Sequence, residues 1–167
     1  MDNDATTSST VSAEDRFGNA DAAYQFDGSS SIMSLPSDML VKDSISISLW
    51  FKTSDFGALL GYQNTAVGQS PSSYVPVVTI DDADQELYGA FWQSSTSAMP
   101  AGNQSNDEWH HLVLTATSGE QNLYIDNELL NTSSAYTKIS LAVSQLGAAY
   151  TGGNWPFGNG DGSTTMD

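Results

Sequence analysis

The stretch Asp107 to Asn131 decides the fold of this chain; it reads Asp-Glu-Trp-His-His-Leu-Val-Leu-Thr-Ala-Thr-Ser-Gly-Glu-Gln-Asn-Leu-Tyr-Ile-Asp-Asn-Glu-Leu-Leu-Asn. Residues 109–115 alternate in the way that is typical of a half-buried strand. Ser118-Gly119-Glu120 predicts a turn into a returning strand, and Asp126-Asn127 predicts a second turn into residues 128–130. The stretch therefore predicts consecutive antiparallel strands.

The clearest single strand is Ser44 to Lys52, Ser-Ile-Ser-Ile-Ser-Leu-Trp-Phe-Lys. Its isoleucines, Leu49 and Phe51 share one face, while its serines, Trp50 and Lys52 share the other. One apolar and one wet face is the pattern of an antiparallel sheet. Shorter strand patterns separated by turn residues, without a competing helical pattern, favour a two-sheet antiparallel β-sandwich. These patterns cover residues 23–26, 31–35, 57–62, 74–81, 86–93 and 138–146.

The length of 167 residues fits one domain. Residues 1–14 are poor in hydrophobic side chains and rich in Ser and Thr, which predicts a flexible polar arm or linker before a sandwich over 15–167. The polar start shows no secretion leader and indicates a piece excised from a larger protein. Cysteine is absent, so disulfides and thiolate metal sites are excluded.

The charge balance is strongly acidic, with 20 acidic residues against four basic ones and a net charge of −16. A chain so poor in cations is a weak partner for nucleic acid or for anionic membrane surfaces. No run of 18 apolar residues exists, so membrane insertion is not expected. The acidity favours solubility, or alternatively adaptation to salty or calcium-rich surroundings.

Catalytic patterns are missing from the sequence. His110 and His111 are its only histidines, and on a strand neighbouring side chains point to opposite faces, so they cannot share one metal ion. There is no Gly-x-Ser-x-Gly motif and no Glu pair at alternate strand positions, which glycoside hydrolysis would use. We therefore expect a protein that is not an enzyme.

Four motifs in this order resemble laminin G-like domains of the concanavalin A-like jelly-roll class. They are the opening from Arg16 to Gly28 with Tyr-Gln-Phe-Asp-Gly, the strand Ser44–Lys52, the segment Gly57–Tyr62 and the hairpin after Trp109-His110-His111. The resemblance implies an all-β, two-sheet antiparallel jelly-roll sandwich. It also implies a secreted or cell-surface recognition module whose partner is a glycan or an extracellular protein.

Two features depart from that family pattern. Asp126-Asn127 replaces the usual Asp-Gly turn, and Asn tolerates the positive φ that this turn needs. The sequence also stops at Thr165-Met166-Asp167, before the family's closing strand. We therefore expect an incomplete domain whose open edge accepts a complementing C-terminal strand or a partner chain.

Calcium is the candidate ion, because Asp-rich turns supply the oxygen ligands that it prefers. The resemblance places a calcium ligand at Asp27, with the Gly28 carbonyl beside it. Asp161, within Asn-Gly-Asp-Gly, and the cluster at 81–84 are further candidates. The alternative is that each is a turn with a solvated Asp side chain.

Aromatic residues are the candidates for ligand binding, since sugar rings lie against exposed aromatic planes. The set comprises Trp155 and Phe157 in a Gly-rich loop, Trp50, Trp92 and Tyr62. Packing in the core is the alternative for each. Together these features predict a non-catalytic carbohydrate-binding module, with calcium as a candidate ion, from a larger bacterial protein. The alternatives are a protein–protein adhesion module without glycan affinity and an accessory domain of a glycan hydrolase or lyase.

Overall fold

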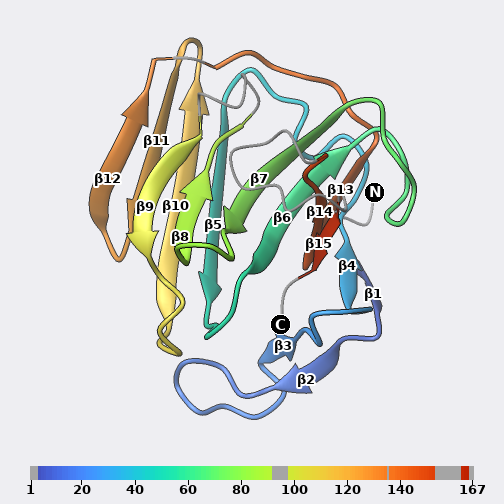
Figure 1. The fold of residues 1–167 in the computed structure, drawn as a ribbon, viewed down its shortest axis with the longest axis vertical. Helices are drawn as coiled ribbons and strands as arrows, with labels where there is room; N and C mark the ends of the chain where they lie inside the picture. Colours follow the sequence, from blue (N-terminus) through green and yellow to red (C-terminus); the bar gives the residue numbers. More distant parts are fainter. Residues whose placement is uncertain (1–3, 92–97, 135, 153–162, 166–167) are drawn as a thin grey trace.

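The computed structural model describes residues 4–91, 98–134, 136–152 and 163–165, and these form antiparallel sheets without any helix. Two sheets stack face to face (Figure 1), which confirms the predicted all-β sandwich. The seven-stranded sheet has the order β1 (Thr6–Ser8), β4 (Ile32–Ser34), β13 (Val143–Leu146), β6 (Gly57–Gln63), β7 (Tyr74–Ile80), β8 (Glu86–Gly89), β9 (Met99–Asn103). The four-stranded sheet has the order β12 (Glu128–Ser133), β11 (Glu120–Ile125), β10 (His110–Thr117), β5 (Ile45–Phe51).

Two smaller pairs complete the described fold. β2 (Val11–Ala13) pairs with β3 (Ala23–Gln25) as a separate hairpin at the lower end of the molecule in Figure 1. β14 (Ala148–Tyr150) pairs with β15 (Ser163–Thr165) and packs on β6 and β7. The larger sheet is therefore covered on part of its outer face as well as on its inner face.

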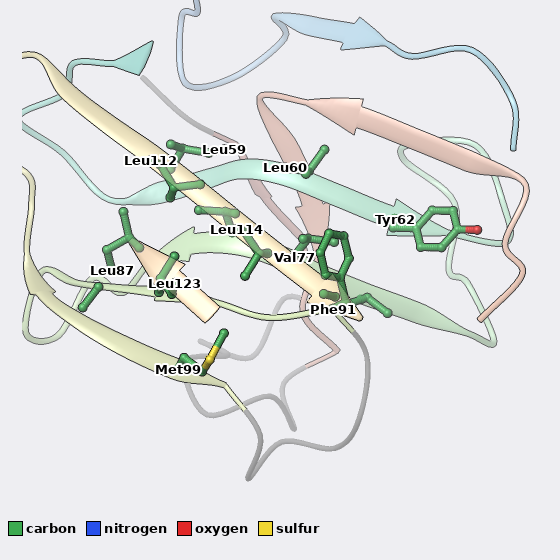
Figure 2. Packing of buried hydrophobic residues seen from close by; sticks show 14 of the residues in the cluster. Leu59, Leu60, Tyr62, Val77, Leu87, Phe91, Met99, Leu112, Leu114 and Leu123 are labelled. Atoms are coloured by element: carbon green, nitrogen blue, oxygen red, sulfur yellow. The ribbon is translucent and has the colours of Figure 1, made fainter. Parts of the chain in front are cut away.

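The core lies between the two sheets and follows from the register of β10. Leu112 is paired with Leu49 of β5 and with Ile125 of β11, as the alternation in both segments predicts. Leu112 and Leu114 have no exposed surface, and Figure 2 shows them packed among side chains of the facing sheet. Each fully buried side chain of this size stabilises the fold by about 1.5–3 kcal/mol relative to exposure.

Gln121 connects the two sheets through hydrogen bonds inside this core. Its side-chain oxygen accepts from the Phe91 N–H at 2.6 Å, and its Nε2 donates to the Phe91 carbonyl at 3.1 Å. Gln121 is completely buried, so these partners offset the cost of removing an amide from water. The segment after β8 is thereby held at a fixed place opposite β11.

The expected turn at Asp126-Asn127 is confirmed. Asp126 has a φ of 50° and Asn127 a φ of 70°, the pair of positive angles found in two-residue hairpin turns. Asn and Asp tolerate this left-handed region better than other residues that carry a Cβ. The replacement of Asp-Gly by Asp-Asn therefore leaves the hairpin from β11 to β12 intact.

Two segments within residues 1–14, where the sequence predicted a flexible polar arm, take part in strand pairs. Residues 6–8 pair with β4, and residues 11–13 pair with β3. Strand pairing uses backbone N–H and C=O groups, so a polar stretch can join a sheet edge without apolar alternation. β9 also went unpredicted, because it contains Pro100 and Gly102, and proline in a sheet is tolerated mainly on edge strands such as this one.

Gly61 lets β14 approach the middle of β6. A Cβ at this position would lie 2.3 Å from the carbonyl oxygen of Ala148. We expect Gly61→Ala to destabilise the fold by about 1–3 kcal/mol, as overpacking does, because the obstacle is backbone. The control is Gly89→Ala, where a Cβ would meet the flexible Leu123 side chain at 3.1 Å and a smaller loss is expected. Denaturant unfolding of both variants measures this, and equal losses would contradict the role of Gly61.

Candidate functional site

The sandwich is closed along one side and open along the other. On the closed side β12 contacts β9, and the Asn131 Nδ2 donates to the Pro100 carbonyl at 3.2 Å. On the open side β5 is the last strand of its sheet, with β10 as its one partner among the described residues. The inward side chains of Ile45, Ile47 and Leu49 on this edge stay half-buried, whereas those of β10 are fully buried.

A groove of about 890 Å³ lies at this open side, around the end of β5. Its apolar lining comes from both sheets and includes Met33, Leu49, Leu59 and Leu146. Its aromatic residues are Tyr24, Phe26, Trp50, Phe51 and Trp109, and its charged residues are Glu14, Asp15, Arg16, Lys52 and Asp107. Lys52 and Asp107 form an ion pair at 3.3 Å. A concave, mainly apolar surface with a few polar groups is the usual form of a ligand site.

Trp50 is the exposed aromatic residue at the centre of this region. It points to the outer face of β5 with 43% of its surface exposed, and its register partner on β10 is His111. The two rings stack with centroids 4.7 Å apart and planes 15° apart. His111 is in turn fixed by Ser48, whose Oγ lies 2.8 Å from the His111 Nε2. The indole is therefore held in one orientation before any ligand binds.

Arg16 brings a positive charge to the same place. Its guanidinium carbon lies 4.1 Å from the centroid of the Trp50 ring and 4.2 Å from that of Phe17, both within the range of cation–π contacts. The Asp15 Oδ1 accepts from the N–H groups of Phe17 and Asn19 at 2.9 Å each. The Asn19 side chain is the main cause that lowers the pKa of Asp15. This ionised turn positions Arg16.

His110 lies on the opposite face of β10 from His111, as the alternation of a strand predicts. It is buried, with its Nδ1 at 2.7 Å from the Asp126 Oδ2 and its Nε2 at 3.0 Å from the Asn106 Oδ1. The other oxygen of Asp126 accepts from the His111 N–H at 2.8 Å. Burial opposes ionisation of Asp126, yet the hydrogen bonds from His111 and His110 lower its pKa overall. This cluster anchors the start of β10 beside the Trp50–His111 stack.

The structure places the predicted ligand-binding residues in different environments. Trp50 is exposed beside the groove, but Tyr62 is buried in the core with 4% exposure. The Tyr62 hydroxyl accepts from the Leu141 N–H at 2.7 Å and donates to the Ile139 carbonyl, so the structure places Tyr62 in the core and not in the lining of the groove. Its strand is buried on both faces, which the sequence did not reveal. Trp92, Trp155, Phe157 and the metal candidate Asp161 lie outside the described residues.

Asp27 forms a compact turn with the residues that follow it. Its Oδ1 accepts from the N–H groups of Ser29, Ser30 and Ser31 at 3.0, 2.7 and 2.8 Å, and its Oδ2 accepts from the Ser30 Oγ at 2.6 Å. These donors, the Ser30 hydroxyl first, hold the pKa of Asp27 far below its usual range. Gly28 completes the turn with a φ of 66°.

This turn does not fit a calcium site. N–H and O–H donors surround the Asp27 carboxylate, whereas calcium needs six or more oxygen ligands. Within the part of the chain that the structure describes, no three His, Asp or Glu side chains gather to hold a metal ion. The structure therefore supports the turn role of Asp27 that the sequence left as the alternative.

Residues 27–164 match the family model of the concanavalin A-like lectin/glucanases superfamily, of laminin G type. A similar solved structure is domain 4 of AbnA, a GH43 extracellular arabinanase from Geobacillus stearothermophilus, in complex with arabinotriose. It has 15% sequence identity and a TM-score of 0.63, over 97% of this chain and 77% of that chain, so the likeness is one of fold. No curated protein matches the sequence.

The described residues contain no helix long and apolar enough to cross a membrane.

We expect Asp27→Asn to lower the melting temperature equally in calcium and in chelator, since the carboxylate binds backbone N–H groups. Because the folded-state pKa lies below the unfolded one, this stabilisation is present above the unfolded pKa and is lost as the pH falls. The difference between wild type and variant should therefore narrow from about pH 6 to about pH 3. Thermal melts at both pH values test this; a calcium-dependent difference would instead restore Asp27 as a metal ligand.

Proposed function

Because the chain belongs to the concanavalin A-like lectin/glucanases superfamily, we propose that it is a carbohydrate-binding module. The observation that carries this proposal is the exposed Trp50 ring, stacked on His111 beside an open groove. His111 and Arg16 both lie against the Trp50 ring, so a sugar ring packs its C–H face on this indole by displacing the Arg16 guanidinium. A domain of similar fold, from AbnA, is known in complex with arabinotriose, which supports the same class of ligand.

The groove supplies the polar contacts that such a ligand needs. Arg16 offers N–H donors next to the indole, and Glu14 and Asp107 offer carboxylate acceptors. Tyr24, with 55% of its surface exposed, is a second aromatic residue in the lining. Sugar hydroxyls both donate and accept hydrogen bonds, so a mixed lining of this kind fixes the orientation of a ring that an aromatic plane holds loosely.

We propose that the module is non-catalytic and works outside the cell. A glycoside hydrolase needs a carboxylic acid whose pKa is raised so that it can donate a proton. In the groove, the hydrogen bonds from Asn19 lower the pKa of Asp15, the opposite of that requirement. A binding module without catalytic activity meets polysaccharides outside the cell, either as part of a secreted protein or at the cell surface.

A protein partner is the second candidate, favoured by the open edge of β5. This strand offers unpaired backbone groups beside half-buried apolar side chains, which is a template for an added strand. The added strand is a C-terminal segment or a segment of another chain. With a net charge of −16, two copies of the chain repel each other, so a neutral or basic strand is the better partner.

For glycan binding, we expect Trp50→Ala to lower the affinity about tenfold or more, as the loss of a contact worth about 1.4 kcal/mol does. The stability should change by less than about 1 kcal/mol, since the side chain lies on the surface. Phe56→Ala is the matched control, because Phe56 is equally exposed at 42% but does not line the groove. Glycan arrays followed by calorimetry measure both; unchanged binding by Trp50→Ala would refute the site.

For strand addition, we expect the backbone amides of β5 that face away from β10 to exchange hydrogen quickly in this chain. A C-terminal extension of about 25 residues that supplies a strand and its connection should slow that exchange and raise the melting temperature. Hydrogen exchange of the two chains measures this. Equal protection of β5 in both would show that the edge takes no strand.

A further inference from the structure

The outer face of the four-stranded sheet carries an apolar row on three of its strands, and Ser48 continues this row on β5. Val113 of β10 is paired with Tyr124 of β11, which is paired with Leu129 of β12. Trp50 of β5 and His111 of β10 are paired with each other in the neighbouring row, at the edge of the sheet opposite β12. We call these five residues, without Ser48, the ridge. Trp50 and Leu129 at its two ends are 43% and 50% exposed, and the three between them are half-buried.

Hydroxyl and amide groups run along one side of the ridge. The next row of the register holds Ser46, Thr115, Asn122 and Thr132. The Thr132 Oγ1 donates to the Asn122 Oδ1 at 2.7 Å, and the Asn122 Nδ2 donates to the Glu120 Oε1 at 2.9 Å. These bonds orient the polar groups beside the ridge. Apolar planes flanked by oriented hydroxyl and amide groups match the alternating C–H and O–H surfaces of a sugar chain.

The length of the ridge indicates more than one sugar unit. Three strand-to-strand spacings of about 4.8 Å separate β5 from β12, so the ridge spans about 14 Å. A single sugar ring is shorter than this span. A ligand that contacts both Trp50 and Leu129 is therefore an oligomer lying across the strands.

The charges of the chain indicate that this oligomer is neutral. The ridge and the polar row beside it contain no Lys or Arg. Three of the four basic residues lie near carboxylates, since Lys52 is paired with Asp107, Lys138 is paired with Asp43, and Arg16 lies beside Asp15; the fourth is Lys42. A polysaccharide with uronic acid or sulfate groups would meet one cation, Arg16, at the Trp50 end of the ridge, and the net charge of −16 would repel it along the rest.

We propose that the ridge binds an uncharged polysaccharide chain across the strands, from Trp50 to Leu129. This inference rests on the proposed carbohydrate binding and names the class and the path of its ligand.

The test compares neutral arabino- and xylo-oligosaccharides of increasing length with polygalacturonate, at low and high salt. We expect the affinity for the neutral series to rise with length until the ridge is filled and to change little with salt. Leu129→Ser should weaken the long oligomers about tenfold and leave the shortest ligand unchanged. Tyr124→Ala should act in the same way, and Trp50→Ala should weaken all lengths. Phe56→Ala is the control, and thermal melts verify folding.

The outcomes separate the two proposals. If polygalacturonate binds better than the neutral oligosaccharides, in a way that depends on salt and on Trp50, the proposal of a neutral ligand is overturned. The proposal of carbohydrate binding then still stands. If neutral sugars bind in a way that depends on Trp50, but their affinity changes neither with oligomer length nor with Leu129→Ser, only the ridge proposal is overturned. If no saccharide binds the folded wild-type chain, carbohydrate binding fails and the ridge proposal fails with it.

Discussion

The register between β5 and β10 is the constraint on which both the core and the candidate site depend. It pairs Leu49 with Leu112 on the inner face and Trp50 with His111 on the outer face. Side chains of a strand alternate, so a slip of one residue would move the indole into the core and the leucines into water. The free energy of burying the leucines therefore also fixes the place of Trp50.

The start of β10 joins the two faces of the sheet. His110 points inward to Asp126, and the same carboxylate accepts the N–H of His111, which points outward. Asp126 stands in a turn with positive φ, so the hairpin geometry and the orientation of His111 are set by one residue. A surface site that is fixed by core packing and by a tight turn needs little reorganisation when a ligand binds.

The sequence predicted those parts of the structure in which burial follows the period of a strand. β5, β10 and β11 were found because one of their faces is buried and the other is wet. The burial of Tyr62 could not be predicted from the sequence, because β14 packs on β6 and burial on both faces of a strand removes the alternating signal. The contact of Arg16 with Trp50 joins residues far apart in sequence, which no local pattern encodes. The strands of the first 14 residues are held through backbone groups, which leave no trace in side-chain composition.

The pairing of β4 with β13 has a consequence for the rate at which this protein folds. It joins Met33 to Leu146, so most of the chain must form a closed loop before β1 and β4 can join the larger sheet. Closing a long loop costs entropy before any contact compensates for it, and folds rich in such distant pairings reach the native state in milliseconds to seconds rather than microseconds. The strands from β6 to β9 and from β10 to β12 pair with their neighbours in sequence and form the local parts of the fold, whereas β1 and β4 can join the larger sheet only after β13 has been synthesised.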